Sequence, residues 1–153
     1  MRIGVISDTH GLLRPEAQRA LHGVQLIIHA GDVGAPEILT QLKLIAPVFA
    51  VRGNVDTEPW AQELPPTTVV EISGFHLYVL HKLQDLDLKP QAAGFDAIIS
   101  GHTHQAEQRY DSGVLYLNPG SAGPRRFQLP VTLAMVELTK KPWDVQLVRL
   151  LGP

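Results

Sequence analysis

The sequence predicts an α/β domain in which two packed β-sheets have helices on their outer sides. In the first 51 residues, strand-like and helix-like runs alternate in a βαβαβ order. This order is typical of parallel strands joined by right-handed crossovers. The second half has closely spaced strand-like runs separated by turn residues, which indicates mostly antiparallel pairing. The 153 residues are enough to bury a core, and we expect residues 1–153 to form one domain.

The first half supplies three expected strands and two expected helices. The strands cover residues 2–7, 25–30 and 48–51, and the helices cover residues 15–24 and 36–45. The second helix begins with Pro36, which is favourable in a first helical turn. Its apolar side chains recur on one side, at Ile38, Leu39, Leu42 and Ile45. That spacing predicts a helix packed against the sheet.

The second half supplies the remaining strands. Ser73-Gly74 looks like a hairpin turn between strands at residues 69–72 and 75–80. Residues 85–93 predict a helix broken by Pro90. Further strands are expected at residues 97–99, 114–117, 131–138 and 145–150. The proline-rich residues 57–68 predict a stiff loop.

Composition and charge exclude several classes of function. The absence of cysteine excludes a disulfide framework, a thiolate zinc site and a cysteine nucleophile. With 13 Lys+Arg against 15 Asp+Glu, the chain has no basic excess, and we do not expect a nucleic-acid partner. No apolar run reaches the roughly 20 residues of a membrane helix. A strand follows Met1 at once, without a signal peptide, so we expect no membrane partner and a cytoplasmic location.

Side chains with metal-binding atoms come directly after the expected strands. They are Asp8, His10, Asp32, Asn54, His81, His102 and His104. The carboxyl ends of parallel strands share one sheet edge, so we expect these side chains to converge. Seven ligands exceed what one ion with an open position can use, whereas two divalent ions can share a carboxylate. Imidazole, carboxylate and amide donors suit manganese, iron, cobalt, nickel or zinc better than calcium or magnesium alone, and they do not choose among the five. Our first expectation is manganese, with nickel, iron, cobalt or zinc as alternatives.

The order of these residues resembles the signature of the calcineurin-like metallophosphoesterase superfamily. The matching segments are Asp8-x-His10, Gly31-Asp32, Gly53-Asn54-x-Asp56, His81 and Gly101-His102-x-His104. The short chain and the later Asn118-Pro119-Gly120-Ser121 look like the small bacterial and archaeal phosphodiesterase branch, which includes the retromer subunit Vps29. The resemblance implies a four-layer α/β sandwich, with two mixed sheets flanked by helices.

The resemblance also implies how two ions would divide the ligands. The first ion would be held by Asp8, His10, Asp32 and His104. The second would be held by Asp32, Asn54, His81 and His102, so that Asp32 bridges. A hydroxide between the ions would attack phosphorus, which gives Asp32, Asn54 and His81 catalytic roles. The implied activity is a metal-dependent phosphoesterase, first of all a phosphodiesterase, acting on a small phosphate ester.

Two positions depart from the family pattern. Val55 stands where many members have a histidine thought to stabilise charge or to protonate the leaving group. Valine can do neither, so we expect a bias toward esters with good leaving groups. Lys82 stands where members usually have glycine; its ammonium either meets a substrate phosphate or points into solvent. Arg125 and Arg126 are further candidates for binding substrate phosphate, because arginine forks suit phosphate oxygens.

Three polar residues near the ligands have expected supporting roles. Asp56 is expected to order its loop by hydrogen bonding rather than to bind metal. His29 is expected to pack beside the site. Asn118 begins a segment expected to form a wall behind the metal-bearing loops.

The alternative function is a phosphoesterase fold that serves as a protein–protein interaction scaffold, as Vps29 does. Scaffold members typically lose metal ligands, whereas every ligand position here has a competent donor, which favours the enzyme. A nuclease ranks lower, because the extra domains and basic face of nucleic-acid enzymes are missing. Small members of the family often form dimers or tetramers, so a homo-oligomer is a further expectation.

Overall fold

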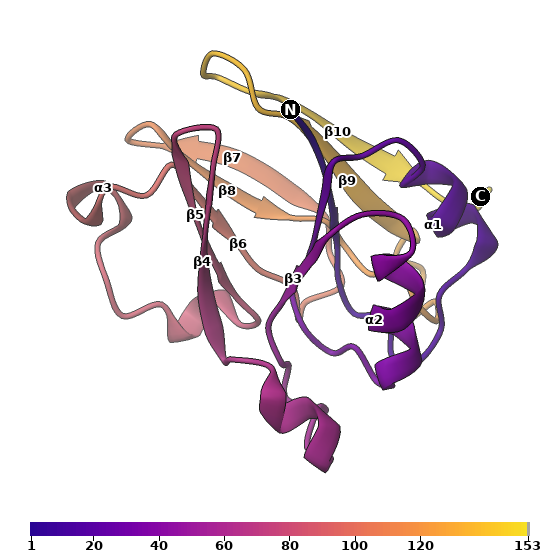
Figure 1. The fold of residues 1–153 in the computed structure, drawn as a ribbon. Coiled ribbons are helices and arrows are strands. Elements are labelled where there is room, and N and C mark those ends of the chain that lie inside the picture. The colour runs from indigo at the N-terminus through magenta and orange to yellow at the C-terminus, as the bar shows by residue number, and fades with distance from the viewer. Residues whose placement is uncertain (153) are drawn as a thin grey trace.

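Two mixed five-stranded sheets pack face to face in the computed structural model, which describes residues 1–152 (Figure 1). The first sheet has the order β10-β9-β1-β2-β3. Its strands are β1 (Arg2–Ile6), β2 (Leu26–His29), β3 (Val48–Ala50), β9 (Thr132–Glu137) and β10 (Asp144–Arg149). The second sheet has the order β4-β5-β6-β8-β7. Its strands are β4 (Thr67–Ile72), β5 (Phe75–Leu80), β6 (Ala97–Ile99), β7 (Glu107–Asp111) and β8 (Val114–Asn118).

The main core lies between the two sheets and follows from strand alternation. Ile3 and Val5 of β1 are buried in the cluster that also contains Leu77 of β5 and Ile99 of β6. Successive residues of a strand point to opposite faces, so Ile6 belongs to a second cluster on the other side of the first sheet. Burial of these aliphatic side chains, at about 25 cal/mol per Å² of apolar surface, holds the sheets together.

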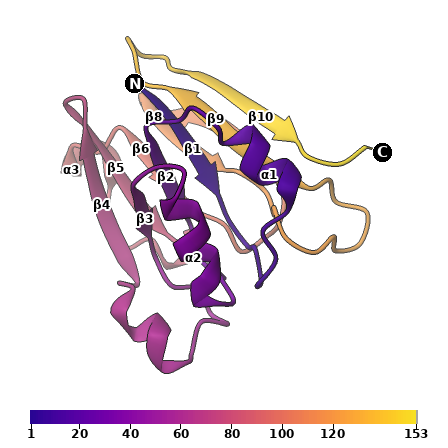
Figure 2. The same ribbon diagram turned by 45° about the vertical axis from the view of Figure 1, so that its right-hand side comes forward.

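Helices α1 (Pro15–Ala20) and α2 (Pro36–Lys43) cover the outer face of the first sheet (Figures 1 and 2). The predicted stripe on α2 is confirmed at Ile38, Leu39 and Leu42, which are buried against this face. The helix ends at Lys43 rather than at the predicted residue 45, so Ile45 lies beyond it and is partly buried against the same cluster. The first helix is shorter than the predicted 15–24. It ends at Ala20, and the chain turns at Gly23, whose φ of 88° is left-handed and incompatible with a continuing helix.

The outer face of the second sheet has a thin covering. The single broken helix predicted over 85–93 is replaced by two short pieces, η2 (Leu83–Asp85) and α3 (Pro90–Ala93). Pro90 does not break a helix but begins α3, because a first-turn residue needs no N–H donor. The apolar cluster on this face includes Leu83, Leu86 and Phe95 beside buried Leu80 and Ile98.

Three features of the second half differ from the predictions. Strand β7 was not predicted; all five of its residues are exposed at the sheet edge, so no apolar alternation marks it. The pairing is also less antiparallel than expected, because β5, β6 and β8 pair in parallel. The expected 57–68 loop contains a short 3₁₀ helix, η1 (Pro59–Glu63). Within residues 1–152, no helix has the length and apolar character required to cross a membrane.

Candidate metal centre

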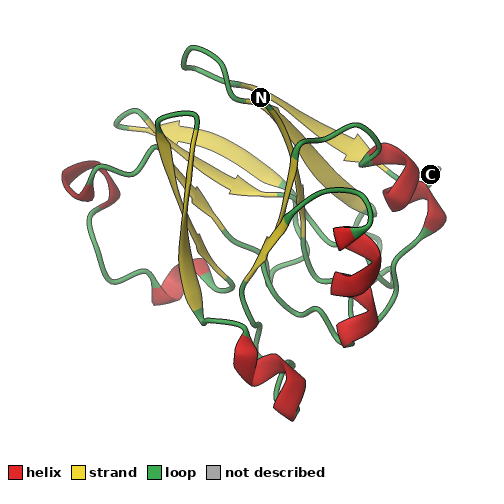
Figure 3. Cartoon of the chain, in the orientation of Figure 1, coloured by secondary structure: helices red, strands yellow, loops and turns green. Residues whose placement is uncertain are grey.

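Six of the seven predicted ligands, all but Asn54, converge from loops that follow parallel strands of the two sheets. Figure 3 shows these strands and the loops at their ends. The loops after β1 and β2 carry Asp8, His10 and Asp32, and those after β5 and β6 carry His81, His102 and His104. Two groups form, and within each group the ligand atoms lie within 4.8 Å of one another. One group is Asp8, His10 and His104, and the other is Asp32, His81 and His102.

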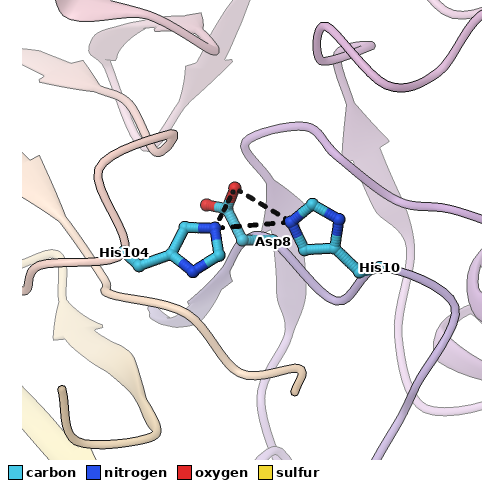
Figure 4. A group of neighbouring side chains, drawn as sticks. All are labelled: Asp8, His10 and His104. Carbon is cyan, nitrogen blue, oxygen red and sulfur yellow. Dashed lines mark hydrogen bonds and ion pairs between the residues drawn. The ribbon is translucent and has the colours of Figure 1, made fainter. Parts of the chain in front are cut away.

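The first group surrounds one oxygen of a buried carboxylate (Figure 4). Asp8 Oδ1 lies 3.3 Å from His104 Nε2 and 3.7 Å from His10 Nε2. The two Nε2 atoms are 3.3 Å apart. Two imidazole nitrogens and a carboxylate oxygen thus point at a common position, which is the donor set of a transition-metal site.

The second group is built around His81. Its Nδ1 lies 2.8 Å from the carbonyl of Ala30 and donates to it. That bond places the proton on Nδ1 and leaves the lone pair of Nε2 available, which is a common way of orienting a metal-binding histidine. Nε2 lies 3.2 Å from Asp32 Oδ2. The ring of His102 stands 5.2 Å from that of His81, centroid to centroid.

Asp32 lies between the two groups. Its Oδ2 is 3.2 Å from His81 Nε2 in the second group and 3.6 Å from His10 Nε2 in the first. Its Oδ1 accepts a hydrogen bond of 3.1 Å from the backbone N–H of Val55. The carboxylate is thereby fixed on one side and directed toward both groups on the other.

Two buried ligand atoms have no hydrogen-bond partner among residues 1–152: Asp8 Oδ1 and His81 Nε2. The other oxygen of Asp8 accepts hydrogen bonds from Ser7 Oγ at 2.7 Å and from the N–H of His102 at 3.1 Å. Buried polar atoms in proteins are nearly always paired. These two atoms lie 3.9 Å apart, can each donate an electron pair and have no hydrogen-bond partner, so they fit a site for divalent cations.

The ligand loops have strained backbones. Asp8, His10, Asp32, His102 and His104 all have positive φ, between 48° and 75°. Residues other than glycine rarely adopt this conformation, which costs of the order of 1–3 kcal/mol each and is concentrated at functional sites. Backbone hydrogen bonds between the first two loops, Asp8 N–H to Gly31 O and His10 N–H to Asp32 O, both 3.0 Å, hold the conformation.

The glycines of the motifs allow these loops to approach closely. A Cβ on Gly53 would overlap the side chain and backbone of Asp32, and one on Gly101 would overlap Ser7 Oγ. The reason for Gly-Asn and Gly-His in the sequence is therefore steric.

Asn118 and Ser121 support the ligand loops from behind. Asn118 Nδ2 donates to the carbonyl of Gly101 at 3.0 Å and to Thr103 Oγ1 at 3.1 Å. Ser121 Oγ donates to the carbonyl of Asp8 at 3.0 Å. The segment therefore binds the loops after both β1 and β6, as the sequence predicted for a supporting wall.

Asp56 binds no side chain of the two donor groups but accepts three backbone hydrogen bonds, as predicted for a loop-ordering residue. Its carboxylate receives the N–H groups of Val33 and Gly34 at 3.0 Å and of Gly53 at 2.8 Å. Two ligand-bearing loops are thus held by one buried carboxylate.

We expect Asp56→Asn to lower the free energy of unfolding by about 2–4 kcal/mol, because an amide NH₂ would face at least one of these N–H groups. Urea unfolding would measure the loss, with the exposed Asp87→Asn as the matched control. A variant as stable as the parent would contradict a structural role for these three bonds.

The local charges keep the two buried carboxylates ionised. Burial alone would raise the pKa of Asp32, but the His81 imidazole beside it and the hydrogen bond from the Val55 N–H outweigh it, and the pKa falls to about 2. For Asp8, burial is likewise outweighed by the neighbouring His10 imidazole, by the hydrogen bond from Ser7 and by the charges of His81 and His104, and the pKa lies below its usual value. Both residues are therefore anionic donors at neutral pH.

His29 is fully buried beside the site and is neutral. Thr9 Oγ1 donates to the carbonyl of Val33 at 2.9 Å, so His29 Nε2 donates to Thr9 Oγ1 at 3.0 Å. Its Nδ1 accepts the N–H of Gly31 at 3.1 Å. Burial lowers the pKa of His29 to about 4, as expected for a residue packed beside the site rather than a ligand.

Because the unfolded chain protonates His29 near pH 6.5 and the folded chain only near pH 4, acid favours unfolding. Stability that is complete above pH 6.5 is lost as the pH falls toward 4, by roughly 2–3 kcal/mol at pH 4.5. Urea unfolding of metal-free protein at pH 7 and 4.5 measures this loss. His29→Gln should show a loss smaller by about that amount; equal losses in the two proteins would contradict the buried neutral state.

The remaining predicted residues are not members of the two groups. Asn54 is exposed and lines a pocket with His81 and Lys82. Arg125 is exposed, and its guanidinium donates to the carbonyl of Gly152 rather than joining the ligands. The charge of Arg126 is near enough to His104 to lower the pKa of that imidazole, after the larger effect of burial. Sequence reasoning missed Arg52, which lines the same pocket as Asn54.

Comparisons with known proteins agree with this architecture. The sequence model of the calcineurin-like phosphoesterase superfamily domain matches residues 1–141. A probable metallophosphoesterase of Methanothermobacter thermautotrophicus is 37% identical, with 100% of this chain and 95% of the relative covered.

Two solved structures share the fold. An archaeal phosphodiesterase has a TM-score of 0.79 at 24% identity, covering 97% of this chain and 100% of its own. Vps29 of Entamoeba histolytica, solved in complex with Zn²⁺, has a TM-score of 0.74 at 24% identity, covering 98% and 99%. The four-layer phosphoesterase architecture predicted from the sequence is thus confirmed, and the chain belongs to the calcineurin-like phosphoesterase superfamily.

Proposed function

We propose that the protein is a metal-dependent phosphodiesterase that hydrolyses small phosphate esters at a centre for two divalent cations. The observation that carries this proposal is the meeting of two donor groups at Asp32, with Asp8 Oδ1 and His81 Nε2 unpaired and directed into the centre. Family membership supports phosphoester chemistry, and a relative from Methanocaldococcus jannaschii that is 26% identical is a phosphodiesterase.

The proposed ligands divide as the two groups do. Asp8, His10 and His104 would hold the first ion, and His81 and His102 the second, with Asp32 shared and Asn54 completing the second set. The ions, manganese first among them, would supply an activated water and neutralise charge on the phosphoryl oxygens.

The protein's own contribution is orientation and charge. Asp32 is fixed by the N–H of Val55, and His81 is held in one tautomer by Ala30. Side chains that are already in position before the reaction lower its barrier, because they need not reorganise as the transition state forms. At position 55 the side chain is valine, 45% exposed and unable to donate a proton. The leaving group therefore departs as its own anion, which favours activated esters.

The test is hydrolysis of bis-p-nitrophenyl phosphate and p-nitrophenyl phosphate by metal-stripped protein. Manganese, nickel, iron, cobalt, zinc or magnesium is added singly, and bound metal is counted by elemental analysis. We expect diester turnover that depends on metal and saturates near two ions per chain. Diester turnover in metal-stripped protein would overturn the proposal.

Val55→His should raise turnover of alkyl phosphodiesters by about 10- to 100-fold, because general-acid catalysis is typically worth 10²–10⁴. Aryl esters should gain much less, since nitrophenolate needs no proton. Val69→His is the matched control, because Val69 on β4 is 46% exposed against 45% for Val55. Equal rates for variant and parent on alkyl esters, at equal metal content, would remove this explanation of the leaving-group bias.

The scaffold remains the second candidate, because similarity to Vps29 structures covers nearly the whole chain. The same experiment separates the two functions. Folded protein that binds two ions but turns over neither ester with any metal would favour the scaffold.

A further inference from the structure

A pocket of about 340 Å³ opens beside the second donor group. Its lining includes His81 and Asn54, which are two of the proposed metal ligands, together with Arg52 and Lys82. The volume is at the lower end of the roughly 300–1,000 Å³ found for small-molecule sites. A substrate held at the metal centre therefore has room beside His81 and Asn54 for a small arm.

The two cationic residues of this pocket are close in sequence to proposed metal ligands. Arg52 lies two residues before Asn54, and Lys82 directly follows His81. Arg52 is partly buried, and its Nη1 donates to the carbonyl of Leu64 at 2.7 Å. Its backbone N–H donates to the carbonyl of Pro65 at 3.0 Å. A guanidinium anchored at one end keeps its other N–H groups for a ligand.

Lys82 is partly buried and makes no ion pair with any carboxylate of residues 1–152. The acidic residue of the pocket, Asp85, is exposed on η2. The formal charge of the lining is therefore positive, with the two cations less exposed than the anion. The other walls are uncharged, formed by Pro66, Thr67 and Leu80.

We propose that this pocket binds a short substrate arm that carries a second negative charge, a carboxylate or a phosphate, while the phosphorus under attack lies at the metal centre. The inference rests on the proposed phosphoesterase function and narrows it to esters with an anionic arm. Arg52 and Lys82 are the residues that select this arm. An arginine fork and an ammonium both suit carboxylate and phosphate oxygens.

Competitive inhibition of bis-p-nitrophenyl phosphate hydrolysis tests the inference with three matched phosphonates. Propylphosphonate has an uncharged arm, 3-phosphonopropionate a carboxylate arm of similar size, and 1,2-ethylenediphosphonate a phosphonate arm. We expect the two charged arms to bind about tenfold more tightly than the propyl arm. The carboxylate and phosphonate affinities show which anion the pocket prefers.

Lys82→Gln and Arg52→Gln should each reduce that ratio to about threefold or less. Lys140→Gln, at an exposed lysine after β9, should leave the ratio unchanged. Because Arg52 also supports Leu64, Lys82→Gln carries the test if the arginine variant is unstable. Equal affinities in the parent, or a ratio unaffected by both variants, would overturn the inference while diester turnover leaves the proposed function intact. Absence of turnover would instead count against the proposed function.

Discussion

Asp32→Ala is expected to lower metal-dependent diester turnover at least about 10³-fold. The carboxylate is the group that lies within 3.2 Å of His81 Nε2 and 3.6 Å of His10 Nε2, so its removal affects both donor groups at once. Its pKa of about 2 makes it an anion at every working pH. The measurement is kcat/KM for bis-p-nitrophenyl phosphate together with the number of bound ions.

Asp87→Ala is the matched control, because Asp87 is exposed and lies outside the centre. It should keep turnover and metal content within about twofold of the parent. Circular dichroism of both variants checks that they remain folded. An Asp32→Ala protein that still bound two ions and turned over at the parent rate would rule out Asp32 as the shared ligand.

Gly53→Ala should lower the free energy of unfolding by about 3 kcal/mol and abolish diester turnover, through one added methyl group. The new Cβ would overlap Asp32 Oδ1 and the backbone nitrogen of Asp32. Neither the backbone nor a fixed ligand can move freely, since the Val55 N–H also binds Asp32 Oδ1. Urea unfolding and ester hydrolysis measure the two losses separately.

Gly152→Ala provides the comparison, because an added Cβ there meets no atom within 4 Å. Its stability should change by less than about 0.5 kcal/mol. Should Gly53→Ala prove as stable and as active as Gly152→Ala, the close approach of these two loops would not hold in solution.

The sequence predicts the fold where apolar periodicity is strong. The stripe on α2 and the buried runs of β1 and β2 report directly which side faces the core. Strand β7 has no such signal, because an edge strand with every residue exposed forms through backbone pairing with β8. The early end of α1 is set by the left-handed turn at Gly23, and glycine alone does not specify its own φ.

The site shows a similar division. Donor residues after strands are visible in the sequence, because strand ends share an edge and the chemistry restricts the residue types. The unpaired state of Asp8 Oδ1 is not visible, since it depends on Ser7 and the His102 N–H occupying the other oxygen. The sequence does not identify Arg52 as a site residue, because its role depends on a pocket formed with Lys82, which comes thirty residues later in the chain.

The two sheets contribute complementary parts of the centre. Asp8, His10 and Asp32 follow strands of the first sheet, whereas His81, His102 and His104 follow strands of the second. Each donor group contains residues from both sheets. Bound ions would therefore cross-link the two sheets and stabilise their packing by an amount that grows with free metal concentration. A destabilising substitution in the core between the sheets, far from any ligand, would accordingly weaken the apparent metal affinity, because metal binding requires the two sheets to be packed together.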